Sequence, residues 1–89
     1  MRNKIERILK QELRILTLRT RERKNLTQKE MSELLSMNEK SYSDIETGMY
    51  KCGTVTCILL LMMQDDPNAF LKELKEKFEK LYHKEMQLI

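Results

Sequence analysis

The sequence predicts a small all-α domain. Its 89 residues include only two glycines and one proline, too few for the many turns of an all-β sandwich. Leu, Met, Glu, Lys and Arg dominate the composition, and all five favour helix. We therefore expect a single domain over residues 1–89, with a thin core, because a chain this short buries only about 60–65% of its unfolded surface.

The first helix is predicted over residues 3–23. Its hydrophobic residues recur at steps of three and four, which places them on one helical face. They are Ile5, Ile8, Leu9, Leu13 and Leu16. Lys24 and Asn25 mark its end, because a basic last turn and a residue that tolerates the left-handed conformation are typical of helix C-termini.

Two short helices follow. Thr27 and Glu30 fit a capping box, so the second helix begins at Thr27 and ends near Ser36. Asn38 is expected to cap a third helix. Gly48 is expected to end it, because Gly most easily adopts a left-handed terminating conformation.

The last two helices differ in their patterns. Residues 54–64 form a fourth helix that is hydrophobic nearly all round, and such a helix is either central or shared with a partner. Asp66 and Pro67 suit the cap and first turn of a fifth helix, residues 67–87. Its hydrophobic face includes Leu71, Leu74, Phe78 and Leu81 at spacing close to that of a coiled coil.

Charge and reactive residues limit the function. Residues 1–30 carry ten basic and four acidic side chains, which suits a polyanion, although a solvated helix face is the alternative. One histidine, no nucleophile–base pair and no metal-ligand cluster argue against an enzyme, a metal site or a cofactor.

Localisation is predicted to be cytoplasmic. The longest apolar run, residues 57–63, is far shorter than the ~20 residues that cross a bilayer. The N-terminus has no continuous apolar segment typical of a secretory signal, and no membrane partner is expected. Cys52 and Cys57 are too few for a disulfide framework and are predicted to be reduced.

The turn Ser36-Met37-Asn38 between two short helices has the spacing of a helix-turn-helix. In that motif the first helix lies across the DNA backbone, and the second places its N-terminal residues at base edges in the major groove.

The amino-acid sequence of these helices also resembles that of a known family. Leu-Thr-Gln at 26–28 and Ile-Glu-Thr-Gly at 45–48 resemble the phage-repressor (Cro/cI-like, XRE) helix-turn-helix family. Ser-Tyr-Ser-Asp-Ile-Glu at 41–46 and Cys-Gly-Thr-Val-Thr at 52–56 resemble small regulators of bacterial mobile elements. The resemblance covers residues 21–63. It implies a five-helix lambda-repressor-like fold, with residues 1–20 as an N-terminal helix extension and residues 66–89 as a C-terminal helix for dimerisation.

The resemblance also implies roles for individual residues. Arg21 is expected to form a structural ion pair with Glu46. Ser36 stands where the family usually has Gly, so a left-handed backbone there would cost about 1 kcal/mol. The predicted contacts to double-stranded DNA are Gln28, Lys29, Asn38, Glu39, Lys40, Ser41, Ser43, Asp44 and Lys51.

Two functions are weighed. The first is a sequence-specific DNA-binding transcriptional regulator, a repressor that binds a palindromic operator as a homodimer through Leu71, Leu74, Phe78 and Leu81. Packing of the first and fifth helices within one chain is the alternative to that dimer seam. The second function is an antitoxin or interaction module whose fifth helix binds a partner protein, either a toxin or another regulator.

Overall fold

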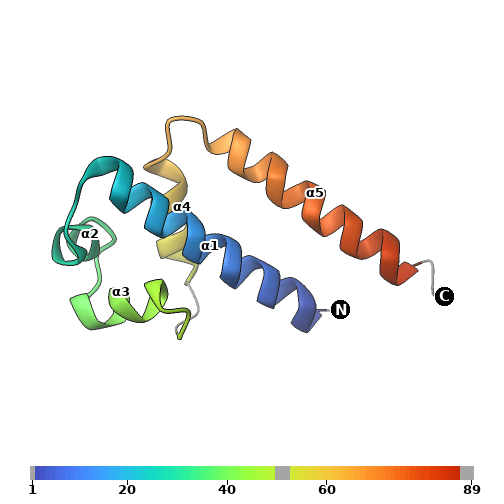
Figure 1. Ribbon diagram of the computed structural model, residues 1–89, viewed down its shortest axis with the longest axis horizontal. Coiled ribbons are helices and arrows are strands. Elements are labelled where there is room, and N and C mark those ends of the chain that lie inside the picture. The colour runs from blue at the N-terminus through green and yellow to red at the C-terminus, as the bar shows by residue number, and fades with distance from the viewer. Residues whose placement is uncertain (1, 50–52, 87–89) are drawn as a thin grey trace.

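A long first helix organises the molecule. The computed structural model describes residues 2–49 and 53–86, and these form five helices and no strand. The helices are α1 (Arg2–Lys24), α2 (Gln28–Leu34), α3 (Glu39–Glu46), α4 (Thr54–Met62) and α5 (Pro67–Met86). α1 contacts α3, α4 and α5, while α2 and α3 pack together at its C-terminal end (Figure 1). The all-α prediction is confirmed for these residues.

The predicted helix starts are confirmed. The Thr27 hydroxyl accepts from the Glu30 N–H, and the Glu30 carboxylate accepts from the Thr27 N–H, which completes the capping box. The backbone N–H of Thr27 above all, and also the Thr27 hydroxyl, lower the pKa of Glu30. The Asn38 side chain caps α3 by accepting from the Ser41 N–H at 2.7 Å.

Three helices end in the same way. Asn25, Ser36 and Gly48 follow α1, α2 and α3, and all three have positive φ, at 54°, 56° and 79°. After each helix, the left-handed residue and the next one donate backbone hydrogen bonds to carbonyls of the last turn. This pair of bonds is the Schellman arrangement, which satisfies carbonyls that would otherwise lack partners. The next residues after Asn25 and Ser36, Leu26 and Met37, pack against the core.

The core lies where α1, α2, α3 and α4 meet. Its fully buried cluster consists of Met31, Leu35, Tyr42 and Leu60. Met31 and Leu35 come from α2 and its C-cap, Tyr42 from α3 and Leu60 from α4. Tyr42 is fully buried, so α3 contributes its aromatic side chain to the core.

The fourth helix is not enclosed by the rest of the fold. Of the two alternatives predicted for it, the central position is therefore wrong. Only Thr56 and Leu60 are buried on α4, whereas Val55, Ile58 and Met62 are exposed. These three lie at steps of three and four, so they share one face of the helix.

Within the described residues, no helix is both long and apolar enough to span a membrane.

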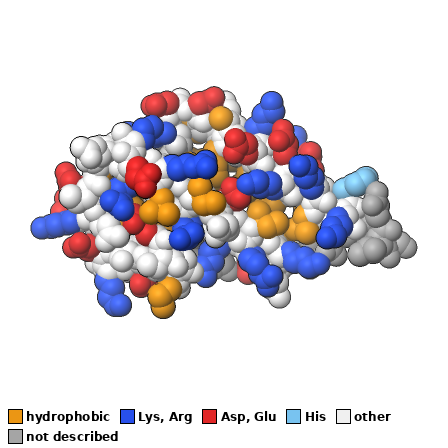
Figure 2. All heavy atoms as spheres, in the orientation of Figure 1, with side chains coloured by type: hydrophobic (Ala, Val, Ile, Leu, Met, Phe, Trp, Pro, Cys, Tyr) orange, Lys and Arg blue, Asp and Glu red, His pale blue; other side chains and the backbone are white. Residues whose placement is uncertain are grey.

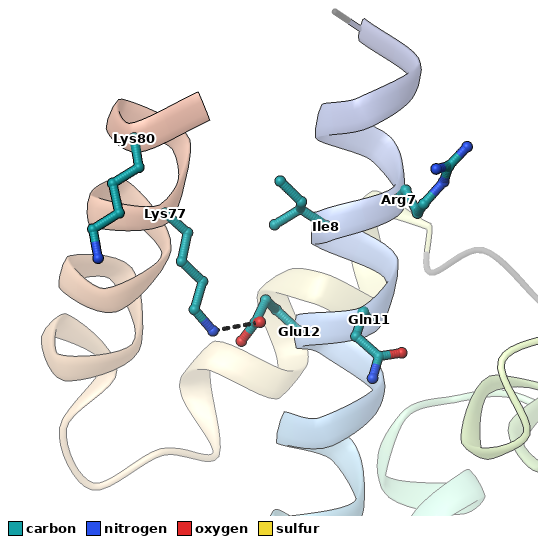
Figure 3. Close-up of a pocket in the computed structure, with 6 residues that line it drawn as sticks. All are labelled: Arg7, Ile8, Gln11, Glu12, Lys77 and Lys80. Carbon is teal, nitrogen blue, oxygen red and sulfur yellow. Dashed lines mark hydrogen bonds and ion pairs between the residues drawn. The ribbon is translucent and has the colours of Figure 1, made fainter. Parts of the chain in front are cut away.

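The fifth helix lies along α1 of the same chain and runs in the opposite direction (Figure 1). This is the arrangement of the in-chain alternative. None of the described α5 side chains is fully buried: Leu74, Phe78 and Leu81 are half-buried, and Leu71 is exposed. Lys77 reaches across a groove of about 450 Å³ to Glu12 of α1, with Nζ 2.5 Å from Oε1 (Figure 3).

Candidate nucleic-acid interface

The turn between α2 and α3 is fixed by backbone geometry. Ser36 adopts the left-handed conformation, as its alignment with a family glycine implied. Its N–H donates to the Glu33 carbonyl at 3.1 Å, and the Met37 N–H donates to the Ser32 carbonyl at 3.0 Å. Asn38 then starts α3 immediately. The relative placement of the two helices is therefore set by a turn with few free torsions.

The Glu46 carboxylate joins three helices. Arg21 donates two hydrogen bonds to it, from Nε to Oε2 at 2.6 Å and from Nη2 to Oε1 at 3.1 Å. Gln28 of α2 donates to Oε1 at 3.0 Å, and the hydroxyl of Tyr42 donates to Oε2. The predicted Arg21–Glu46 ion pair is thus present. With Gln28 and Tyr42 it forms a cluster, called here the Glu46 cluster, of side chains from α1, α2 and α3.

Burial and hydrogen bonding compete at this carboxylate. Burial acts to raise the pKa of Glu46, but the hydrogen bonds from Arg21, Tyr42 and Gln28 outweigh it, so the pKa lies below its ordinary value. The hydrogen bond to Glu46 raises the pKa of Arg21. Burial, together with the bond to Glu46, raises the pKa of Tyr42. At neutral pH the group is a charged, fully hydrogen-bonded cluster.

The main chain of Glu46 is held as well. Arg14 donates from Nε to the Glu46 carbonyl at 2.7 Å, at the last turn of α3. A cation suits this position, because a helix C-terminus carries a partial negative charge. Arg21 also reaches the Leu26 carbonyl at 3.2 Å, so it ties the end of α1 to the same cluster.

One face of α3 turns inward and the other outward. Tyr42, Ile45 and Glu46 are buried. Glu39 and Lys40 are exposed. Of the other predicted contacts on α3, Ser41, Ser43 and Asp44 are half-exposed. Glu39, Lys40, Ser43 and Asp44 therefore form an outward surface, called here the α3 outer face, because steps of one, four and five residues keep them on one side of a helix.

The remaining predicted DNA contacts lie in different positions. Lys29 is exposed near the start of α2, and Asn38 is exposed while its side chain caps α3. Gln28 is half-buried, and its amide group is directed to Glu46. Lys51 lies outside the described residues.

The α3 outer face offers donors and acceptors suited to base edges. Lysine donates to guanine O6 and N7, carboxylates accept from cytosine N4, and serine does either. No group of His, Cys, Asp and Glu in residues 2–49 and 53–86 could hold a metal ion. The chemistry available at this face is hydrogen bonding and charge.

Three partners of Glu46 were missed by the sequence reasoning. Gln28 was expected at DNA and instead donates to the Glu46 carboxylate. Tyr42 lies four residues before Glu46, a spacing that puts both on one helical face and could have indicated the bond. Arg14 lies 32 residues away, and no local pattern points to it.

Comparisons with protein-family models, curated proteins and solved structures found no match for this chain.

Proposed function

We propose that this chain is a sequence-specific DNA-binding transcriptional regulator with a lambda-repressor-like helix-turn-helix fold. The observation that carries the proposal is the Glu46 cluster, which fixes α3 against α1 and α2 while the α3 outer face stays accessible. A reading helix must be held rigidly, because base recognition depends on hydrogen bonds placed within fractions of an ångström. In this interpretation α2 crosses the DNA backbone and the first turns of α3 enter the major groove.

The charges on the α3 outer face support recognition of a DNA site that contains both guanine and cytosine on the strand it contacts. Lys40 supplies a donor, whereas Glu39 and Asp44 supply acceptors. The two carboxylates favour cytosine-containing positions, and they repel phosphates. Such a face contributes to specificity more than to general affinity, so phosphate contacts have to come from other surfaces.

Dimerisation is part of the proposal. A single half-site contains too few base pairs for high specificity, and two copies related by a two-fold axis double the contacts. Two apolar surfaces support it: the exposed α4 face formed by Val55, Ile58 and Met62, and the exposed Leu71 on α5. A dimer on a palindromic operator would repress by blocking access of the polymerase to the promoter.

The test is selection of bound duplexes from a randomised DNA pool at near-physiological salt, followed by sequencing. We expect an enriched palindrome whose half-site spacing reports the dimer geometry. The matched pair of variants is K40E and K72E, which make the same charge change on the α3 outer face and on the exposed side of α5. K40E is expected to weaken binding to the selected duplex, and K72E to leave it nearly unchanged.

Two results would overturn the proposal. A pool without enrichment would show that the α3 outer face does not read sequence. Equal effects of K40E and K72E would show that only net charge matters. Light scattering on the free protein, on the DNA complex and on a co-purified partner protein would separate a homodimer from the protein-interaction function.

A further inference from the structure

The N-terminal half of α1 carries a basic surface next to the end of α3. Arg7, Lys10 and Arg14 lie at steps of three and four, so they share one face of the helix. Together with Gln11 and Gly48 they line a groove of about 410 Å³. Gly48 is the residue that ends α3, so the groove joins α1 to the helix that carries the α3 outer face.

The cations of this surface have an acidic neighbour on α1, Glu6, which lines an adjoining hollow with Arg7 and Lys10. Arg7 and Lys10 are exposed, and neither side chain forms a hydrogen bond or an ion pair among the residues that the structure describes. The Oε1 atom of Glu6 lies 3.6 Å from Nε of Arg2. Three like charges along one groove repel one another, and an anion placed between them would relieve that repulsion.

Arg14 is held in place at the end of this surface that adjoins α3. Its Nε donates to the Glu46 carbonyl, and its side chain packs across Gly48. Arg14 makes no other side-chain hydrogen bond within residues 2–49 and 53–86, so its terminal amino groups are available to an anion. Its guanidinium is therefore pre-positioned, because the bond to α3 limits its rotamers.

The basic groove adjoins the groove between α1 and α5, and Arg7 and Gln11 line both. Figure 3 shows Ile8 pointing toward α5 and Arg7 pointing away from it, on the other side of α1. Figure 2 shows several Lys and Arg side chains over this half of α1 on the face in view. The basic surface therefore runs from the edge of the α1–α5 groove to the side of α1 next to Gly48, at the end of α3.

We propose that Arg7, Lys10 and Arg14 bind the phosphate backbone of duplex DNA beside the stretch that α3 reads. This inference rests on the proposed function and extends it to a second contact surface. Lys40 and Gly48 are eight residues apart, about 12 Å along the helix direction at roughly 1.5 Å per residue. The major groove is about 12 Å wide, so phosphates at its edge fall near this groove when α3 lies in it.

The experiment measures binding to an arbitrary duplex of about 30 base pairs, roughly three helical turns, by fluorescence anisotropy over about 0.05–0.3 M salt. Arbitrary sequence is chosen because phosphate contacts carry no sequence information. The test variant is R7Q/K10Q. The matched control is K72Q/K84Q, which removes the same charge from exposed positions on α5.

Removing one side chain that binds a phosphate lowers the slope of log affinity against log salt by about 0.9, and lowers affinity roughly eightfold at 0.1 M salt. We expect R7Q/K10Q to lower the slope by about 1.8 for each protomer bound, and the control to leave it unchanged. Circular dichroism melts should show equal stability for all three proteins, because the exchanged side chains are exposed.

The outcomes separate this inference from the proposed function. Equal slopes for wild type, R7Q/K10Q and K72Q/K84Q would overturn the inference, even if the randomised pool yields a palindrome. A pool without enrichment would overturn sequence reading, while a slope change specific to R7Q/K10Q would still place DNA phosphates at this surface. Vesicles of phosphatidylcholine and phosphatidylserine form a further arm. Loss of vesicle binding with DNA binding unchanged would overturn the inference and assign the surface to membranes.

Discussion

Two carboxylates, Glu46 and Glu12, each pair with a basic residue that is distant in the sequence, but their surroundings differ. The Glu46 side chain is 5% exposed and its partner Arg21 is 24% exposed. The Glu12 side chain is 17% exposed and its partner Lys77 is 47% exposed. Glu46 receives hydrogen bonds from Gln28 and Tyr42 as well, whereas Lys77 adds one ion pair to a half-buried seam.

The α2–α3 region and the α5 region differ in how strongly their packing and hydrogen bonds hold them in place. The α2–α3 region combines a fully buried cluster with directional bonds to a buried charge. The α5 region contributes no fully buried side chain among its described residues. Regions with few buried contacts open at lower free energy than the global unfolding. The α2–α3 region presents the α3 outer face, and the α5 region is expected to open at lower free energy.

The largest expected effect compares two leucines. L60A removes a fully buried side chain from the core and should lower the free energy of unfolding by about 3 kcal/mol. L74A removes a half-buried one from α5 and should lower it by about 1 kcal/mol. Urea unfolding monitored by circular dichroism measures both. Equal losses would show that the α5 seam is as firm as the core.

The second effect compares the two carboxylates directly. E46Q removes the charge that Arg21 faces in a nearly buried site, and should cost about 2 kcal/mol of unfolding free energy at neutral pH. E12Q, on the more exposed pair, should cost no more than about 0.5 kcal/mol.

The pH dependence sharpens this comparison. The pKa of Glu46 in the folded state lies below 4.5, its value in the unfolded chain. The contribution of the Glu46 charge to the free energy of unfolding is therefore fully present above pH 4.5. It is lost as the pH falls through the folded-state pKa. The difference in unfolding free energy between wild type and E46Q, measured by urea titration, should become smaller below pH 4.5. A gap of constant size down to pH 2 would contradict the assignment of the charge to Glu46.

Local features of the fold could be predicted from the sequence. Thr27 and Asn38 cap helices through bonds to residues three positions away. Asn25 and Gly48 end helices through their own backbone preference. In each case the interaction lies within one turn of helix, so the residues that make it are visible in a short window of sequence. The Arg21–Glu46 pair, 25 residues apart, came instead from the family resemblance.

Long-range features could not be predicted in the same way. The all-round apolar pattern of residues 54–64 carries no direction, so it could not show that Val55, Ile58 and Met62 would be exposed. Gln28 was expected at DNA because of its place in the motif, while its amide group lies at Glu46 in the fold. Both outcomes depend on where α4 and α3 pack against α1, which no local pattern contains.

The smallest expected effect concerns the turn that joins the two halves of the candidate interface. Ser36 has φ 56°, a conformation that costs a residue with a Cβ about 1–2 kcal/mol. S36G removes that strain, but it also gives the unfolded chain more freedom, which offsets about 0.4–1 kcal/mol. The net gain should be about 0.5 kcal/mol, or roughly 2–4 °C in Tm for a domain of this size.

The matched control for this turn is S43G, in the middle of α3. There the backbone is helical, so Gly should destabilise by about 0.5–1 kcal/mol. Opposite signs for the two serine-to-glycine changes would show that backbone conformation decides their effects. Loss of stability in S36G would mean that the Ser36 side chain contributes more than its strain removes, and that the turn is set by contacts and not by φ alone.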